Sequence, residues 1–463
     1  MRKSRLPFPE GFLWGAATAA HQVEGGNTNN DWWAFEQRPG AIWNGQRSGQ
    51  ACDWWTEAER DFDLMAEMGH NTHRLSVEWS RIEPEEGEFD LTAVARYREM
   101  LSGLRSRGIE PMVTLFHFSS PVWLAAQGGW RNPAAVEHFR RFVGFTVEQL
   151  GDLVTLWCTI NEPNVYAALG YLLGEHAPGE RSLRAYFRVL HHLLEAHAGA
   201  YRLIRAMDGQ AQVGLVKNIY IFEPLEEEAT VSQQVAQLMD SLFNGVTLTA
   251  VQDGKLSPPL RLLPGTYGPL VDSVDFVGAN YYFRSRVSVR SRNGGRLQIL
   301  GLTPGAETSD AGRNGPYGEV YPAGMYRVLK RVGRMGKPIY ITENGLPDRD
   351  DDQRPRFLLS HLAEVQRAIA EGVDVRGYYH WTFTDNFEWA EGWGLRFGLV
   401  ALDPETQARR PRRSAQLYSS IIRENAITAE MVREYAPELA ETLAWRSSRI
   451  PDRTDGGGQN QRT

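Results

Sequence analysis

The chain contains little cysteine, with only Cys52 and Cys158 among its 463 residues. Two thiols are too few for a disulfide framework or a cysteine-based zinc site, so we expect reduced cysteines in a cytoplasmic protein. No apolar run reaches the roughly 18 residues that a membrane-spanning helix needs. The basic start, residues 1–9, has no apolar stretch behind it, which argues against a secretory signal.

The chain also lacks a large excess of either positive or negative charge. Lys and Arg number 50 and Asp and Glu 57, which leaves a net charge of −7. Over this length, such a charge is too small to attract nucleic acid or an anionic membrane, so we expect neither as a partner. Hydrophobic residues make up 42% and charged residues 23%, as is typical of a folded globular protein. The composition leaves the oligomeric state open.

Aromatic residues, by contrast, make up 11% of the chain, and many stand beside polar residues. Examples are Tyr282 after Asn280, Trp381 after His380, and Trp389 after Glu388. Aromatic faces next to hydrogen-bonding groups suit sugars, whose rings have C–H faces and hydroxyl rims. Core packing explains aromatic residues equally well as a class, so the composition only favours a carbohydrate ligand.

A short apolar or β-branched run that ends in a polar cluster recurs eight times. Stretches with helical periodicity separate the runs, and strands that alternate with helices form a parallel sheet. Eight such units predict an α/β fold, a single (β/α)8 TIM barrel at residues 1–445, with a disordered tail at 446–463. The runs are 12–18, 70–77, 111–117, 154–161, 213–218, 274–282, 338–344 and 375–381, and helices are expected at 91–107, 134–150, 183–207, 324–335 and 356–371. Residues 25–51 and 284–322 are expected to be loop insertions at the barrel mouth.

Polar clusters follow almost every predicted strand. Because the loops after parallel barrel strands converge on one face, we predict a single site there. Two acids carry the chemistry: Glu162 ends the fourth run and Glu343 ends the seventh. A carboxyl at a strand end loses water on one side, so its charge must be compensated or its proton retained. A lone acid could equally cap a helix or pair with a loop cation, but two acids with polar residues on other strand ends favour catalysis.

The segments around these acids, Thr-Ile-Asn-Glu-Pro at 159–163 and Ile-Thr-Glu-Asn-Gly at 341–345, strongly resemble glycoside hydrolase family 1, the β-glucosidase and β-glycosidase family. Further similar blocks at 12–25, 74–81, 280–282 and 385–389 follow the family's order. The resemblance implies a retaining mechanism without a metal or organic cofactor. Glu343 would attack the anomeric carbon, while Glu162 would protonate the leaving oxygen and then activate water.

The resemblance also implies supporting roles for other residues. Arg74 and the Tyr282 hydroxyl would favour ionised Glu343, whose charge would in turn help Glu162 keep its proton. The family's positions for binding the innermost sugar correspond to Gln22, His117, Asn161, Tyr282, Glu388 and Trp389, with Trp381 as a platform under the ring and Asn280 as a support. Residues 118–120 are Phe-Ser-Ser, whereas many family members have Trp-Asp before the proline. The resemblance therefore implies no role for Phe118.

The resulting expectation is an exo-β-glycosidase for a small β-glycoside or oligosaccharide with a terminal unphosphorylated glucosyl residue. Galactose and fucose remain open alternatives. A 6-phospho-β-glycosidase is a rival, although the Glu388 carboxylate would repel a phosphate. A non-catalytic glycan-binding relative and an endo-acting glucanase on the same barrel are two further alternatives.

Overall fold

Eight parallel strands close into a barrel in the computed structural model, which describes residues 5–227, 229–254, 260, 270–292 and 296–441. Their order around the barrel is β13-β14-β2-β3-β4-β5-β6-β8. The predicted fold class is therefore confirmed, and each predicted run overlaps one barrel strand. The strands are β2 (Leu13–Ala17), β3 (Thr72–Ser76), β4 (Glu110–Phe116), β5 (Leu156–Asn161), β6 (Gln212–Asn218), β8 (Phe276–Asn280), β13 (Ile339–Asn344) and β14 (Val375–Trp381). The predicted tail at 446–463 lies outside the described residues.

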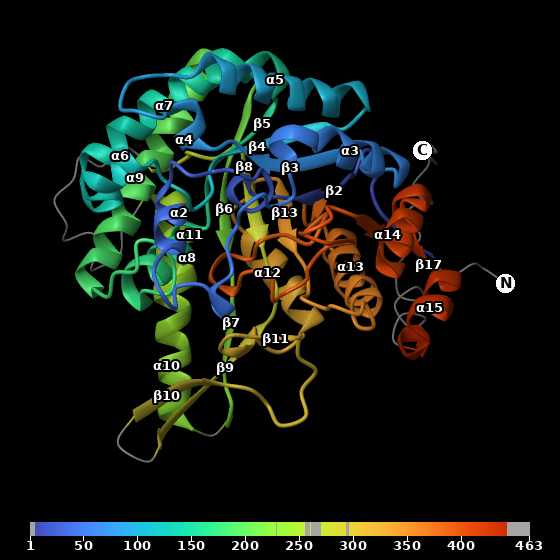
Figure 1. Cartoon of the computed structure of the whole chain (residues 1–463). Coiled ribbons are helices and arrows are strands. Elements are labelled where there is room, and N and C mark those ends of the chain that lie inside the picture. Colours follow the sequence, from blue (N-terminus) through green and yellow to red (C-terminus); the bar gives the residue numbers. More distant parts are fainter. Residues whose placement is uncertain (1–4, 228, 255–259, 261–269, 293–295, 442–463) are drawn as a thin grey trace, which may run out of the picture.

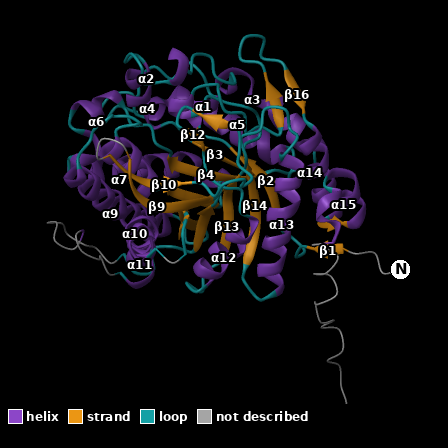
Figure 2. Cartoon of the chain, turned by 90° about the horizontal axis from the view of Figure 1, so that it is seen from below, coloured by secondary structure: helices purple, strands orange, loops and turns teal. Residues whose placement is uncertain are grey.

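Helices surround the barrel (Figures 1 and 2). The five predicted helices agree with the observed ones within two residues at each end, and 134–150 and 183–207 coincide with α7 and α9. The larger helices are α3 (Trp54–Glu67), α5 (Leu91–Ser106), α7 (Ala134–Leu150), α9 (Leu183–Met207), α12 (Pro322–Gly333), α13 (Arg354–Ala370) and α14 (Arg413–Glu424). The shorter ones are α1 (Ala20–Val23), α2 (Asp31–Glu36), α4 (Trp79–Ile82), α6 (Val122–Ala126), α8 (Pro163–Ala167), α10 (Thr230–Asp240), α11 (Val246–Asp253) and α15 (Ala429–Tyr435).

The sequence explains these elements locally. Every residue of β3, β5, β8 and β13 is buried, as expected for parallel strands covered on both faces. Helix α9 begins where the Ser182 hydroxyl accepts a hydrogen bond from the Ala185 amide at 3.2 Å, and α5 begins in the same way at Asp90. None of the helices in the described part of the chain combines the length and apolar character needed to span a bilayer.

The two stretches expected to be loops contain regular structure. Residues 25–51 include α2, and residues 284–322 include β9 (Arg284–Arg292), β10 (Arg296–Gly301), β11 (Ala311–Gly312) and β12 (Gly315–Pro316). Strand β9 pairs with β10 and with β7 (Ile221–Pro224), and this small sheet extends with α10 away from the barrel (Figure 1). Strand pairing outside the barrel thus replaces the expected loop. The remaining strands form two pairs, β1 (Arg5–Pro7) with β17 (Ala426–Thr428) and β15 (Val400–Leu402) with β16 (Arg409–Pro411).

Candidate active site

A cavity of about 220 Å³ lies at the carboxyl ends of the barrel strands. Eight of the eleven predicted site residues line it: His117, Asn161, Glu162, Tyr282, Glu343, Trp381, Glu388 and Trp389. The other three, Gln22, Arg74 and Asn280, are buried and hydrogen-bonded to residues that line the cavity. The structure therefore brings all eleven residues together from seven barrel strands and the loops that follow them.

Both oxygens of Glu343, at the end of β13, have strong hydrogen-bond donors. Arg74, from β3, donates from Nη1 to Oε1 at 2.6 Å, and Tyr282 donates its hydroxyl to Oε2 at 2.6 Å. Arg74 is fully buried and Glu343 is 4% exposed. A buried cation and a hydroxyl donor both favour the carboxylate form, so this side chain is prepared to carry a negative charge.

Backbone packing two residues after Glu343 holds the end of this strand in place. Gly345 lies so close to β14 that a Cβ atom would stand 1.9 Å from the carbonyl oxygen of Trp381. Only glycine allows this approach, which brings the end of β13 against the end of β14. The Glu-Asn-Gly part of the motif thereby joins Glu343 to the aromatic wall formed by Trp381.

Glu162 directly follows β5 and precedes α8, with a left-handed φ of 45°. Its Oε1 accepts hydrogen bonds from the side-chain amides of Asn218 and Asn280, each at 2.8 Å. Burial and the negative charge of Glu343 raise the pKa of Glu162 to about 8. The carboxyl therefore keeps its proton at neutral pH, and the two amide donors on Oε1 leave Oε2 to carry it. The two acids of the cavity thus have different surroundings: a cation and a hydroxyl donate to Glu343, whereas Glu162 receives only amide donors and keeps its proton.

His117 presents a hydrogen-bond donor to the cavity. The Asn161 carbonyl oxygen accepts from Arg74 at 2.7 Å, so its amide group donates to His117 Nε2 at 3.0 Å. Burial and the nearby charge of Arg74 hold the pKa of His117 well below its ordinary value. The neutral ring therefore carries its proton on Nδ1, which has no hydrogen-bond partner within the described chain.

Gln22 and Glu388 form a second polar group. The Gln22 amide donates to Glu388 at 3.2 Å and to the Phe387 carbonyl at 2.9 Å, which leaves its buried Oε1 without a partner among the residues described. Burial and the charge of Glu343 raise the pKa of Glu388 to about 8, against the effects of Trp381 and Gln22. Unpaired polar atoms beside a cavity are normally satisfied by a ligand or water.

Aromatic rings support this wall of the cavity. Trp389 stacks on His21 with a centroid separation of 6.0 Å and packs against Trp32 at 4.6 Å. Phe118, at the position where the sequence departs from the family, also lines the cavity and lies 5.3 Å from the Trp389 ring. The departure therefore keeps an aromatic side chain at this position.

The sequence patterns did not predict several residues that line the cavity. Asn218 ends the fifth run, so the strand-end rule that found the other polar residues could have found it. Tyr317 lies in the 284–322 insertion, where no local pattern marked it, and it packs between Phe283 at 5.5 Å and Phe397 at 5.9 Å. Further lining residues are Val165, Leu169, Glu175, His176, Tyr220 and Glu391.

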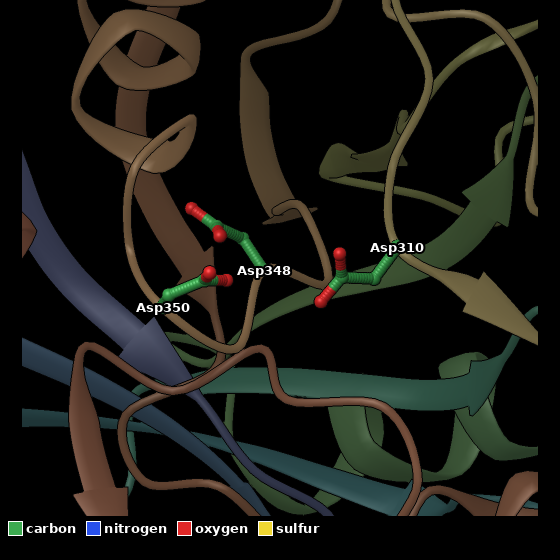
Figure 3. A group of neighbouring side chains, drawn as sticks. All are labelled: Asp310, Asp348 and Asp350. Atoms are coloured by element: carbon green, nitrogen blue, oxygen red, sulfur yellow. The ribbon is translucent and has the colours of Figure 1, made fainter.

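Three carboxylates outside the cavity lining also lie together: ligand atoms of Asp310, Asp348 and Asp350 are within 4.8 Å of one another (Figure 3). Asp348 accepts from the backbone amides of Asp351, Gln353 and Arg354 where α13 begins. Asp310 accepts from the backbone amide of Arg349 at 2.9 Å, and Asp350 is exposed. Hydrogen bonds to the backbone amides of the helix start and of the preceding turn account for Asp348 and Asp310.

Comparisons with known proteins agree with this geometry. The profile described as glycosyl hydrolase family 1 matches residues 4–427. Beta-glucosidase A of Thermotoga maritima is 34% identical over 91% of this chain and 98% of its own, and the 1,4-beta-D-glucan glucohydrolase of Thermotoga neapolitana is 33% identical over 91% and 99%. Among solved structures, the beta-glycosidase from Pyrococcus horikoshii has 41% identity and a TM-score of 0.81, covering 93% of this chain and 98% of that one. The Thermotoga maritima beta-glucosidase in complex with castanospermine has 32% identity and a TM-score of 0.84, covering 91% of this chain and 99% of that one.

Proposed function

The chain belongs to glycosyl hydrolase family 1, and from this premise we propose that it is a retaining β-glucosidase. Its substrates would be small β-glycosides or oligosaccharides that end in an unphosphorylated β-D-glucosyl residue. The observation that carries the proposal is the pair of buried acids in one cavity, Glu343 with Arg74 as its cation and Glu162 with its pKa raised by burial. The two-step mechanism needs both states at the same pH.

In this proposal, Glu343 is the nucleophile and Glu162 the acid–base residue. As Glu343 attacks the anomeric carbon, the bond to the leaving oxygen breaks and the Glu162 proton passes to that oxygen. Esterification removes the negative charge of Glu343, which was one cause of the raised pKa of Glu162. Glu162 can then act as a carboxylate base that takes a proton from water, while the water attacks the same anomeric carbon and the ester bond to Glu343 breaks to regenerate its carboxylate. Two displacements retain the configuration, and a carboxyl separation of ~5–5.5 Å is expected for them.

The unpaired polar atoms suit a sugar. His117 Nδ1 would donate to a sugar hydroxyl and Gln22 Oε1 would accept from one, so a ligand would satisfy both buried atoms. Trp381 would support the ring face, and Asn161 would bind the 2-hydroxyl. Glu388 would bind further hydroxyls, with Trp389 beside it. No Lys or Arg occurs among the described residues that line the cavity, so a 6-phosphate would find no cation there.

A panel of nitrophenyl β-glycosides, with cellobiose and lactose alongside, tests the substrate. We expect release of the aglycone from the β-glucoside, with the β-anomer of glucose as the first product seen by NMR. First formation of the α-anomer would contradict a retaining mechanism. No release from any glycoside would instead favour the glycan-binding alternative. Hydrolysis of 6-phosphoglycosides alone, or of internal bonds in a glucan, would favour the other two rivals.

The pH dependence of kcat/KM is expected to be bell-shaped, with its alkaline limb near pH 8. Glu162 can donate only while protonated, and since its pKa is raised to about 8, activity should fall as the pH rises through that value. The measurement is kcat/KM for 4-nitrophenyl β-glucoside between about pH 5 and pH 10. Because burial also raises the pKa of Glu388 to about 8, Glu388→Gln is the matched control and should keep the limb in place. Loss of the limb in that variant would assign it to Glu388 instead.

A further inference from the structure

Lys217, the second-last residue of β6, is a buried lysine that the proposed mechanism does not use. The residue is only 1% exposed to solvent. Burial of an ammonium group is costly unless a countercharge lies close. Lysine, unlike arginine, can lose its proton when buried, so its charge can respond to its surroundings.

Within the described residues, no carboxylate contacts the Lys217 ammonium group directly. Its Nζ donates to the backbone carbonyl of Asn218 and lies 4.6 Å from the centroid of the Phe243 ring. The charged groups that face it are Glu162 after β5, Asp240 of α10 and Arg331 of α12. Asp240 already accepts from Arg331 at 2.6 Å and from the Asn244 amide at 2.7 Å. Glu162 is therefore the facing carboxyl that is not already paired with a cation.

A short path of hydrogen bonds also joins Lys217 to Glu162. The Asn218 carbonyl accepts from Lys217, and from the Asn164 amide at 3.4 Å. The side chain of the same Asn218 donates to Glu162 Oε1 at 2.8 Å. Lys217 therefore contacts the residue that holds the acid–base carboxyl, and it lies outside the cavity lining.

We propose that Lys217 is a positioning residue whose ammonium form supplies the countercharge for Glu162 when that carboxyl ionises. This inference rests on the proposed function. Before the first displacement, Glu162 is protonated, and Arg74 balances the charge of Glu343. After Glu343 is esterified and Glu162 has given its proton to the leaving group, a buried carboxylate must persist until water attacks.

The surroundings of Lys217 allow its charge to change together with that of Glu162. Burial holds the pKa of Lys217 well below its ordinary value, and the charge of Glu162 raises it again. Ionisation of Glu162 therefore favours uptake of a proton from water by Lys217. Other elements also set the pKa of Glu162. The charge of Glu343 raises this pKa, whereas Lys217, Asn218 and Asn280 lower it. Arg74 of β3 also faces Glu162.

The variant Lys217→Met separates the two half-reactions when it is assayed with 2,4-dinitrophenyl β-glucoside. This leaving group needs no proton, so kcat/KM reports the first displacement and kcat reports the second. We expect kcat/KM to stay native and the acid limb of kcat to move up by about one pH unit, so that kcat on the acid side of this limb falls roughly tenfold. Azide, a nucleophile that needs no general base, should restore kcat. The matched control is Lys330→Met, which removes a partly exposed lysine paired with Glu371.

A second variant distinguishes charge from hydrogen bonding. Lys217→Gln keeps a donor for the Asn218 carbonyl but carries no charge, so it should behave like Lys217→Met. A native kcat profile in Lys217→Gln would overturn the proposal, as would equal losses in kcat and kcat/KM without recovery in azide. Thermal unfolding identifies a variant that fails to fold, and the other substitution then decides. If the native enzyme releases no dinitrophenol at all, the proposed function fails, whereas an active enzyme with an unmoved acid limb refutes only the role of Lys217.

Discussion

Glycine in place of Glu343 is expected to lower the hydrolysis of aryl β-glucosides by roughly five to six orders of magnitude. The substitution removes the carboxylate that we propose as the nucleophile, and without it the two displacements of the proposed mechanism cannot be completed. Arg74 keeps its hydrogen bonds to Thr114 at 3.0 Å and to Asn161 at 2.7 Å, so the barrel should still form. Initial rates and thermal unfolding of the variant measure both expectations.

Azide or formate should restore part of this lost activity, with inversion. The vacated space beside Arg74 can accept a small anion, which attacks the anomeric carbon once from the face that Glu343 used. A single displacement gives the α-glycosyl product, and NMR identifies it. The exposed Glu405 provides a matched control, because Glu405→Gly should keep native rates without any anion. Native turnover by Glu343→Gly without added anion would exclude Glu343 as the nucleophile.

Alanine in place of Glu162 is expected to affect substrates according to their leaving groups. For cellobiose and alkyl β-glucosides, whose leaving oxygen needs a proton, kcat/KM should fall by roughly 10²- to 10⁴-fold. For 2,4-dinitrophenyl β-glucoside, kcat/KM should remain near the native value because the leaving anion is stable by itself. The kcat on this substrate should still fall, since the second displacement loses its base.

Azide again provides the diagnostic for Glu162→Ala. It attacks the glycosyl-enzyme without a general base, so it should raise kcat on the dinitrophenyl substrate and yield the β-glycosyl azide. The β-configuration distinguishes this variant from Glu343→Gly, whose azide product is α. Glu405→Ala serves as the surface control. Equal losses of kcat/KM across good and poor leaving groups would remove the acid role from Glu162.

Local sequence patterns were sufficient for the barrel but not for its additions. Barrel strands such as β5 and β13 are buried along their whole length, begin with apolar residues and end in polar ones, so they can be recognised without knowledge of their neighbours. Strand β9 was not predicted because it is stabilised by pairing with β7 and β10, which lie at different distances along the chain. The same limitation hid Tyr317, whose place at the cavity depends on that insertion.

The strand-end pattern predicts where the site residues lie, but it does not distinguish the chemical states of Glu162 and Glu343. Both acids end a barrel strand, and only the family resemblance implied an ionised Glu343 and a protonated Glu162. In the structure, Glu343 receives the Arg74 guanidinium and the Tyr282 hydroxyl, while Glu162 receives only amides and faces a negative charge. The difference in protonation follows from these contacts. Lys217 likewise looks like part of an ordinary strand until its burial and its neighbours are known.

The order of the eight strands and the gathering of eleven polar and aromatic residues at one face were thus determined by the sequence itself, because strand ends converge in any parallel barrel. Only the tertiary structure shows the contacts that make the two acids differ. The ion pair between Arg74 and Glu343 joins residues 269 positions apart, and the bond from Asn280 to Glu162 spans 118. Contacts of that range depend on how strands close around a common axis, and the pKa of a buried carboxyl depends on those contacts.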